Sequence, residues 1–296
     1  MIRLYFYLSI CTLVCFQVNA AIPAAQKQQI QQAISENDWD TAEEIAEELT
    51  EQFSHEAEAY YLLALAIRNK MENVSSMRAL MNTGDYQEAL EKAIQLDPQH
   101  LEARTEQIGF LIQAPGVAGG DRELAAEKIK QLKPIHALRA AQMSLQLASA
   151  EEKPEQQLLA IDEVINLEPE NKRHMITKGI LLMNQKQYSA ADKALEQAEA
   201  DTDQSVALAA LYQRARWRIL ADQETQLSAQ WLQDYIQRYP QLENTDGLPD
   251  LGAAYWRLGL AHELSGDQAA ALSALKTSVE LNPDFKPAKK DLKRLR

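Results

Sequence analysis

The sequence predicts an all-α fold built from consecutive helical hairpins, on three observations. Helix-breaking residues are few, since the 296 residues include only ten glycines and ten prolines. Apolar residues recur at helical spacing on both sides of a short turn within residues 252–285. A Leu-x-Pro tripeptide ends four such runs, at Leu96-Asp97-Pro98, Leu132-Lys133-Pro134, Leu167-Glu168-Pro169 and Leu281-Asn282-Pro283.

These tripeptides mark repeated helix ends. Proline cannot continue a helix, and it disfavours the α conformation in the residue before it. The first three tripeptides lie 36 and 35 residues apart, which is a repeat period. A period of this length predicts an array of similar helical units.

Residues 1–20 are predicted to be a signal peptide that is removed from the mature protein. Arg3 gives a positive start, residues 4–16 form an apolar run, and Val18-Asn19-Ala20 supplies small residues before a new N-terminus at Ala21. The run has 13 residues, which is too short to span a bilayer. A lipoprotein signal at Cys15 is the alternative. We therefore expect a periplasmic protein without a membrane span, with secretion as the other possibility.

Cysteine use and net charge exclude several classes of function. Both cysteines, Cys11 and Cys15, lie in the predicted leader, so the mature chain has no disulfide, thiolate nucleophile or cysteine metal ligand. The chain carries 30 basic and 43 acidic residues, and removal of Arg3 with the leader brings the net charge to −14. Nucleic acid is not an expected partner of such an acidic protein.

Two segments set the register of the repeat. Both place apolar, small and turn-forming residues in the same register of a helix-turn-helix unit, and residues 252–285 are the clearer of the two. In that segment these residues are Leu258, Gly259, Gly266, Asp267, Ala271 and Pro283; in residues 172–205 they are Gly179, Leu182, Tyr188, Ala191, Leu195 and Ala198. Small residues are needed where paired helices approach closely, and enlarging them costs about 1–3 kcal/mol.

This pattern resembles the tetratricopeptide repeat. The resemblance implies a right-handed superhelical solenoid of about seven hairpins. The predicted units are residues 23–56, 57–100, 101–136, 137–171, 172–205, 206–241 and 252–285. An insertion at residues 69–84 accounts for the late position of Pro98, and the polar residues 242–250 precede the last unit. The chain as a whole looks like a group of exported bacterial tetratricopeptide proteins of unassigned activity.

Residues 286–296 are predicted to form a basic capping helix. They contain six basic residues and one acidic residue, Asp291, with Leu292 and Leu295 three residues apart. A solenoid needs a polar-faced end because its last hairpin would otherwise expose an apolar side. Contact of this basic segment with anionic envelope components is the alternative.

No catalytic, cofactor or metal site is expected. The glycine-rich residues 116–120 lack the Gly-Lys-Ser/Thr ending of a nucleotide loop, and Asp121 is placed to cap the next helix. Ser273-Ala274-Leu275-Lys276 matches the Ser-x-x-Lys of penicillin-binding enzymes, but the companion motifs are absent. The five histidines include neither a His-Glu-x-x-His motif nor a pair four residues apart.

The resemblance also implies a binding face, because the first helices of successive tetratricopeptide units line the concave side. The candidates for this groove are Tyr61, Arg68, Arg173, Ile176, Ile180, Met183, Tyr212, Arg216 and Trp256. Aromatic residues, arginine and methionine contribute most to interface energies. Packing of Tyr212 and Trp256 between helices is the alternative. The lysine and asparagine set of the carboxylate-clamp branch of the family is absent.

We therefore expect a non-enzymatic scaffold of the cell envelope that binds a protein or an extended peptide in the concave groove. Arginines in an acidic protein favour a segment that carries a carboxylate. The convex face and residues 69–84 are alternative binding surfaces. An assembly factor that holds an apoprotein client is the alternative function, and a cell-wall hydrolase is a third.

Overall fold

A computed structural model describes residues 22–296, so the predicted signal peptide lies outside the described residues. These residues form helices joined by turns and loops, with no strand among them, and they divide into two compact units at Gly120 and Asp121. The all-α prediction is confirmed. The division falls inside the predicted unit 101–136, between its two helices.

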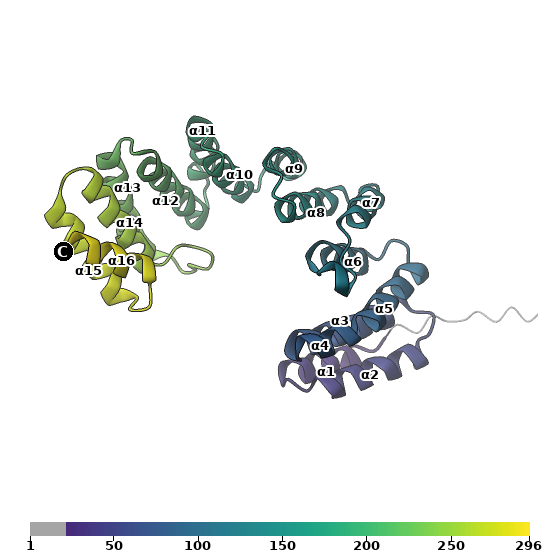
Figure 1. The fold of residues 1–296 in the computed structure, drawn as a ribbon. Coiled ribbons are helices and arrows are strands. Elements are labelled where there is room, and N and C mark those ends of the chain that lie inside the picture. The colour runs from purple at the N-terminus through teal and green to yellow at the C-terminus, as the bar shows by residue number, and fades with distance from the viewer. Residues whose placement is uncertain (1–21) are drawn as a thin grey trace, which may run out of the picture. The chain divides into compact units, whose positions relative to one another are not determined.

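The described part of the first unit is a stack of paired helices (Figure 1). Its helices are α1 (Ala24–Ser35), α2 (Trp39–Gln52), α3 (Ala57–Asn73), α4 (Ser76–Met81), α5 (Thr83–Leu96), α6 (Leu101–Gln113) and the 3₁₀ helix η1 (Gly116–Ala118). Helix α2 packs on both α1 and α3, and α5 packs on both α3 and α6. The short helix α4 lies within the predicted insertion and exposes Met77, Leu80 and Met81.

The second unit continues the pattern of helix, turn and helix (Figure 1). Its helices are α7 (Arg122–Leu132), α8 (Ala137–Ala150), α9 (Pro154–Leu167), α10 (Arg173–Asn184), α11 (Tyr188–Glu199), α12 (Gln204–Ala221), α13 (Thr225–Arg238), the 3₁₀ helix η2 (Tyr239–Gln241), α14 (Leu251–Leu264), α15 (Gln268–Leu281) and α16 (Lys286–Leu295). Each α-helix packs against the next, and α12 also contacts both α10 and α14. The helices α10, α12 and α14 therefore form one continuous row.

Local sequence explains where several of these helices begin. Asp121, Asp250 and Asp267 accept hydrogen bonds from backbone N–H groups at the starts of α7, α14 and α15. Such caps satisfy donors that have no partner inside the helix. The expected cap at Asp121 is confirmed, and its carboxylate occupies the helix start where a phosphate would otherwise bind.

Two glycines allow the paired helices to approach closely. A Cβ atom at Gly179 of α10 would lie 2.6 Å from Leu195 of α11, and one at Gly259 of α14 would lie 2.7 Å from the Leu275 Cγ atom of α15. Leu195 and Leu275 are themselves fully buried. The side chain of one helix therefore fills the space that the glycine of its partner leaves open.

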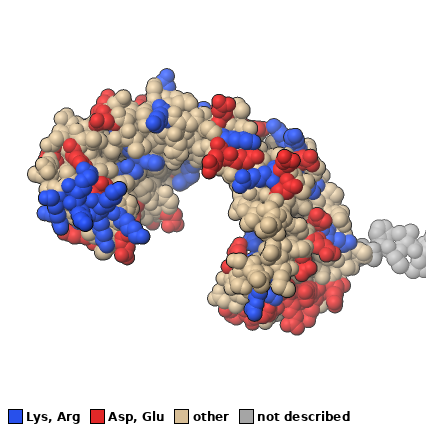
Figure 2. All heavy atoms as spheres, viewed as in Figure 1, with Lys and Arg blue, Asp and Glu red and all other residues tan. Residues whose placement is uncertain are grey.

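The last helix, α16, packs on α14 and α15 and buries Ala288 and Leu292. Its lysines face outward, and Figure 2 shows them as a basic patch at the C-terminal end of the second unit. Its Asp291 accepts a hydrogen bond of 2.8 Å from the Trp256 indole of α14. Helix α16 is thus joined to α14 by both apolar and polar contacts.

We expect the same substitution to have opposite effects at two helical glycines. Gly179→Ala should lower the free energy of unfolding by about 1–3 kcal/mol because its Cβ overlaps Leu195. Gly109→Ala in α6 should raise it by about 0.5–1 kcal/mol, because that position has open space and alanine stabilises a helix. Urea unfolding followed by circular dichroism measures both. Equal effects at the two positions would contradict the packing described.

Candidate functional site

Most of the predicted groove residues lie on the row of α10, α12 and α14. Some of them are part of the hydrophobic core, and others make polar contacts. Ile176, Ile180 and Met183 pack with Leu182, Leu195 and Trp217 in a hydrophobic cluster of α10, α11 and α12. Tyr212 is buried in the next cluster, where its ring lies 5.2 Å from that of Tyr235. These four residues stabilise the stack, and little of Met183 or Tyr212 remains exposed for a partner.

Arg173, at the start of α10, forms contacts within the unit. Its guanidinium donates to the Asp203 carboxylate at 3.0 Å and to the Ser205 hydroxyl at 2.7 Å. Asp203 is the residue that caps α12, so this pair joins the starts of two neighbouring first helices. The arginine is exposed, and its charge is already partly compensated.

The two candidates of the first unit are also engaged in local contacts. Arg68 of α3 donates to both oxygens of Glu106 on α6, at 2.8 and 2.9 Å, and Glu106 also accepts from the buried Tyr86 hydroxyl at 2.8 Å. The Tyr61 ring lies at a tilt against the ring of His100, with the two centroids 5.1 Å apart. Tyr61 and Arg68 therefore contribute to the packing of α3 against α5 and α6.

Trp256 of α14 contacts the C-terminal helix. Its indole N–H donates to Asp291, and its ring meets the Phe285 ring edge-on at 5.4 Å. The neighbouring Arg257 guanidinium lies over the same indole ring, 4.1 Å from its centroid. Trp256 is thus a fixed surface that supports the side chain of Arg257.

Arg216 of α12 and Arg257 of α14 differ from the other arginines of this row. Both side chains are partly buried, and the Nε atom of each is buried without a hydrogen-bond partner in the described structure. Arg216 donates only to the Gln213 amide oxygen, at 3.1 Å. Among residues 22–296, neither arginine has a carboxylate within ion-pair distance. Two adjacent helices therefore bring uncompensated cations together.

The pKa values show that these groups interact. Burial lowers the pKa of Arg257; the Tyr212 hydroxyl acts in the opposite direction, and the charge of Arg216 adds to the lowering. Burial raises the pKa of Tyr212, so its hydroxyl keeps its proton at neutral pH. Arg216 and Arg257 thus bring two guanidinium groups together, and the buried Tyr212 hydroxyl lies beside Arg257. We call these three residues the arginine pair site.

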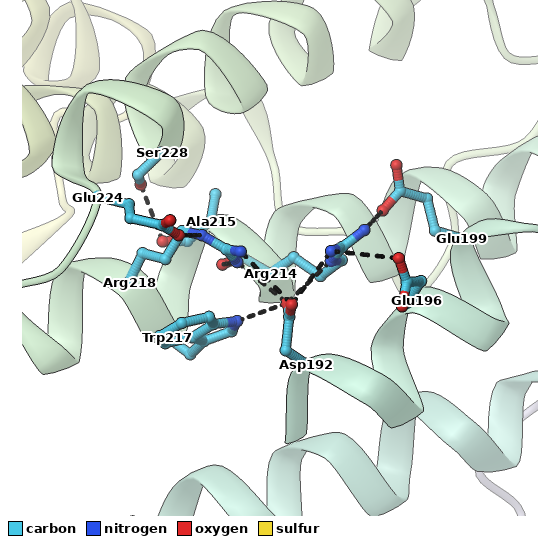
Figure 3. Close-up of polar contacts among 9 residues, drawn as sticks. All are labelled: Asp192, Glu196, Glu199, Arg214, Ala215, Trp217, Arg218, Glu224 and Ser228. Atoms are coloured by element: carbon cyan, nitrogen blue, oxygen red, sulfur yellow. Dashed lines mark hydrogen bonds and ion pairs between the residues drawn. The ribbon is translucent and has the colours of Figure 1, made fainter. Parts of the chain in front are cut away.

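Two other arginines of α12 are fully compensated, as Figure 3 shows. The carboxylate of Asp192 on α11 accepts from Arg214 Nε at 2.9 Å, from Arg218 Nη1 at 3.0 Å and from Trp217 Nε1 at 2.8 Å. Arg214 also pairs with Glu199 at 2.6 Å, and Arg218 pairs with Glu224 at 2.9 Å. The network joins α11 and α12 to the start of α13.

Aromatic rings add to this network. The Arg218 guanidinium lies 4.2 Å from the Trp217 ring centroid and 4.3 Å from that of Trp231, and Arg214 lies 4.7 Å from the same Trp231 ring. Burial alone would raise the pKa of Asp192, but hydrogen bonds from Arg214, Arg218 and Trp217 outweigh it and hold the pKa far below its usual value. Asp192 therefore carries a structural negative charge.

Sequence reasoning identified Arg216 but missed Arg257 and the Asp192 network. Consecutive helical residues point about 100° apart, so the assignment of Trp256 to the groove left Arg257 off the expected face. One feature of the sequence could have indicated Arg257, because it directly follows the groove candidate Trp256 in residues 252–285, the clearest unit. For Asp192 the signal was weaker, because it is one of 43 acidic residues.

The first unit has a groove of different character. It has a volume of about 830 Å³ between α2, α3 and α5, with Tyr60, Leu63 and Ile67 among its lining residues. The charged residues that line it are Glu43, Glu47, Asp85, Glu88, Glu91 and Lys92. Four of the five carboxylates are exposed, whereas a general acid is usually tuned by an apolar pocket. These four carboxylates therefore lie in solvated surroundings.

Two other kinds of feature are absent from the described residues. Residues 22–296 contain no group of three or more histidine, cysteine, aspartate or glutamate side chains arranged to hold a metal ion. None of the helices described is both long and apolar enough to cross a membrane.

Comparison with known proteins supports the repeat assignment. Residues 252–285 match the family model of the tetratricopeptide repeat, which confirms the resemblance predicted for this segment. Comparison with curated proteins finds no matching sequence.

Solved structures of tetratricopeptide proteins share the fold at low sequence identity. The C-terminal part of a repeat-containing protein from Cytophaga hutchinsonii is 16% identical, with 90% of this chain and 98% of that chain covered and a TM-score of 0.59. A tetratricopeptide protein from Parabacteroides merdae is 11% identical, with coverage of 92% and 97% and a TM-score of 0.54. Pseudomonas aeruginosa pilF is 15% identical, with coverage of 80% and 97% and a TM-score of 0.52.

Asp192→Asn should lower the free energy of unfolding by roughly 1.5–3 kcal/mol at pH 7, because two guanidinium groups lose their shared charged acceptor. The control is Asp234→Asn, which removes an exposed pair with Arg238 and should cost less than about 1 kcal/mol. Urea unfolding of each variant against the wild type measures both changes.

The difference between the wild type and Asp192→Asn should also depend on pH. The folded-state pKa of Asp192 is lowered, so its contribution is complete above the unfolded value of about 3.9 and is lost as pH falls below it. Unfolding free energies measured between neutral and strongly acidic pH test this. A difference that grows on acidification would contradict the assigned role of the carboxylate.

Proposed function

We propose that this chain, whose residues 252–285 form a tetratricopeptide repeat, is a non-catalytic scaffold of the cell envelope that binds an extended segment of a partner protein. The fold supports protein–protein interaction as the general activity, because stacked hairpins offer long continuous surfaces. The binding surface would be the row of α10, α12 and α14 in the second unit. The convex face and α4 are the competing surfaces.

The observation that carries this proposal is the arginine pair site. Buried charged groups are normally paired, and Arg214 and Arg218 of the same unit follow that rule. Arg216 and Arg257 do not, although they lie on neighbouring helices of the predicted binding row. Buried charged groups without a partner destabilise the free protein. A bound partner that supplies the missing interactions would explain why they are present.

The periplasmic location rests on the leader alone. Arg3, the apolar run after it and Val18-Asn19-Ala20 have the order of a cleaved signal peptide. Within this location a client could be an extended segment of a mature protein or an apoprotein awaiting assembly. The scaffold mechanism is the same in both cases.

Site-specific photo-crosslinking in the native cell tests the binding surface. A photoreactive amino acid at Thr177 of α10 or Gln213 of α12 should capture a partner, because both positions are partly exposed on the row and Gln213 contacts Arg216. The controls are Gln233 of α13 and Ser273 of α15, which are exposed on second helices and should give no adduct. Adducts only from the controls, or from Met77 of α4, would place the partner elsewhere.

Fractionation and N-terminal sequencing test the location. We expect the native protein in the periplasmic fraction, with Ala21 as its first residue. An intact leader or a cytoplasmic protein would refute the envelope assignment while leaving the binding surface open to test.

A further inference from the structure

The arginine pair site has the chemistry of an anion receptor. Resting on the function proposed above, we infer that the guanidinium groups of Arg216 and Arg257 bind a carboxylate of the partner segment, either an acidic side chain or a C-terminus. The juxtaposition, on the contacting helices α12 and α14, of two partly buried guanidinium groups with unpaired Nε atoms assigns this role. The partner segment should therefore carry an acidic group where it contacts Arg216 and Arg257.

The charges explain why an anion would bind here. Two like charges on α12 and α14 repel each other, and burial weakens the solvent screening between them. Each guanidinium offers a planar fork that matches a carboxylate, and a charge-assisted hydrogen bond is about twice as strong as a neutral one. A bound carboxylate would therefore relieve repulsion and satisfy the buried donors in one step.

The surroundings favour a monoanion over a dianion. The chain has a net charge of −13, and Asp291 is close enough to affect the pKa of Arg257. A phosphate dianion would be repelled about twice as strongly by these negative charges as a carboxylate. A carboxylate of a polypeptide is also consistent with a scaffold that binds an extended segment.

The C-terminal helix positions one half of this receptor. Asp291 of α16 holds the Trp256 indole through a hydrogen bond of 2.8 Å, and Phe285 contacts the ring from its edge. The Arg257 guanidinium lies on the face of that ring. Trp256 is thus a positioning residue for the anion site, and Asp291 holds its indole ring in place.

Nuclear magnetic resonance of the arginine Nε–Hε groups in the whole protein tests this inference directly. The probe is acetyl-Ala-Glu-amide, and its neutral match is acetyl-Ala-Gln-amide. Titration with the glutamate peptide should move the Arg216 and Arg257 signals to saturation. The Arg214 signal is the internal control and should stay in place, because its Nε already donates to Asp192.

Variants separate positioning from general charge. Arg216→Lys and Arg257→Lys keep the cation but lose the fork, and each should weaken peptide binding by about tenfold or more. Trp256→Leu, which removes the ring under the Arg257 guanidinium, should also weaken binding while the Arg214 signal stays in place. Equal binding by all variants would overturn the assigned roles.

Three results would overturn the inference. They are no movement of the Arg216 and Arg257 signals, equal movement with the glutamine peptide, and tighter binding of inorganic phosphate than of the glutamate peptide. The function proposed above fails separately, through crosslinking. Capture of a partner at Gln213 without any carboxylate binding would keep the scaffold and remove the receptor.

Discussion

The close approach of paired helices at glycine is the constraint on which the second unit depends. At Gly179 and Gly259 the opposing leucines occupy the space that even the methyl group of an alanine at the glycine position would need. That contact sets the distance between the two helices of a hairpin, and the next hairpin packs on the surface that results. Because the spacing is fixed by packed side chains, the row of α10, α12 and α14 is a rigid surface on which polar groups keep their positions.

A rigid row decides which charged side chains find partners within the protein. On α12, Arg214 and Arg218 lie four residues apart and reach the same carboxylate of α11. Arg216 lies between them in sequence, and its position about 200° around the helix from each takes it away from that carboxylate. There its charge acts on Arg257 of α14 and lowers the pKa of that guanidinium. One short segment of α12 therefore contributes to both a structural network and the arginine pair site.

The two arrangements differ in what they contribute. The Asp192 network satisfies its donors internally and fixes three helices, so its residues are constrained by stability. The arginine pair site leaves donors unsatisfied and is supported from behind by Trp256 and the C-terminal helix. Proteins commonly carry such local costs where binding takes place. This contrast within one unit is the physical basis for placing function on α12 and α14.

The sequence alone determined the helical hairpins, their turns and the small residues between paired helices. These features are local, since helix periodicity, capping aspartates and helix-ending prolines act within a few residues of themselves. It also identified Arg216 and Trp256 as candidates from the repeat register. Only the tertiary structure decided that Arg68 and Arg173 are paired, that Met183 and Tyr212 are buried, and that Arg257 joins Arg216. Charge compensation and burial depend on side chains contributed by other helices, often some 30 to 40 residues away in the sequence. Arg173 is paired with Asp203 in this way, and Arg68 with Glu106. No local pattern records those neighbours, because they become neighbours only when the hairpins stack.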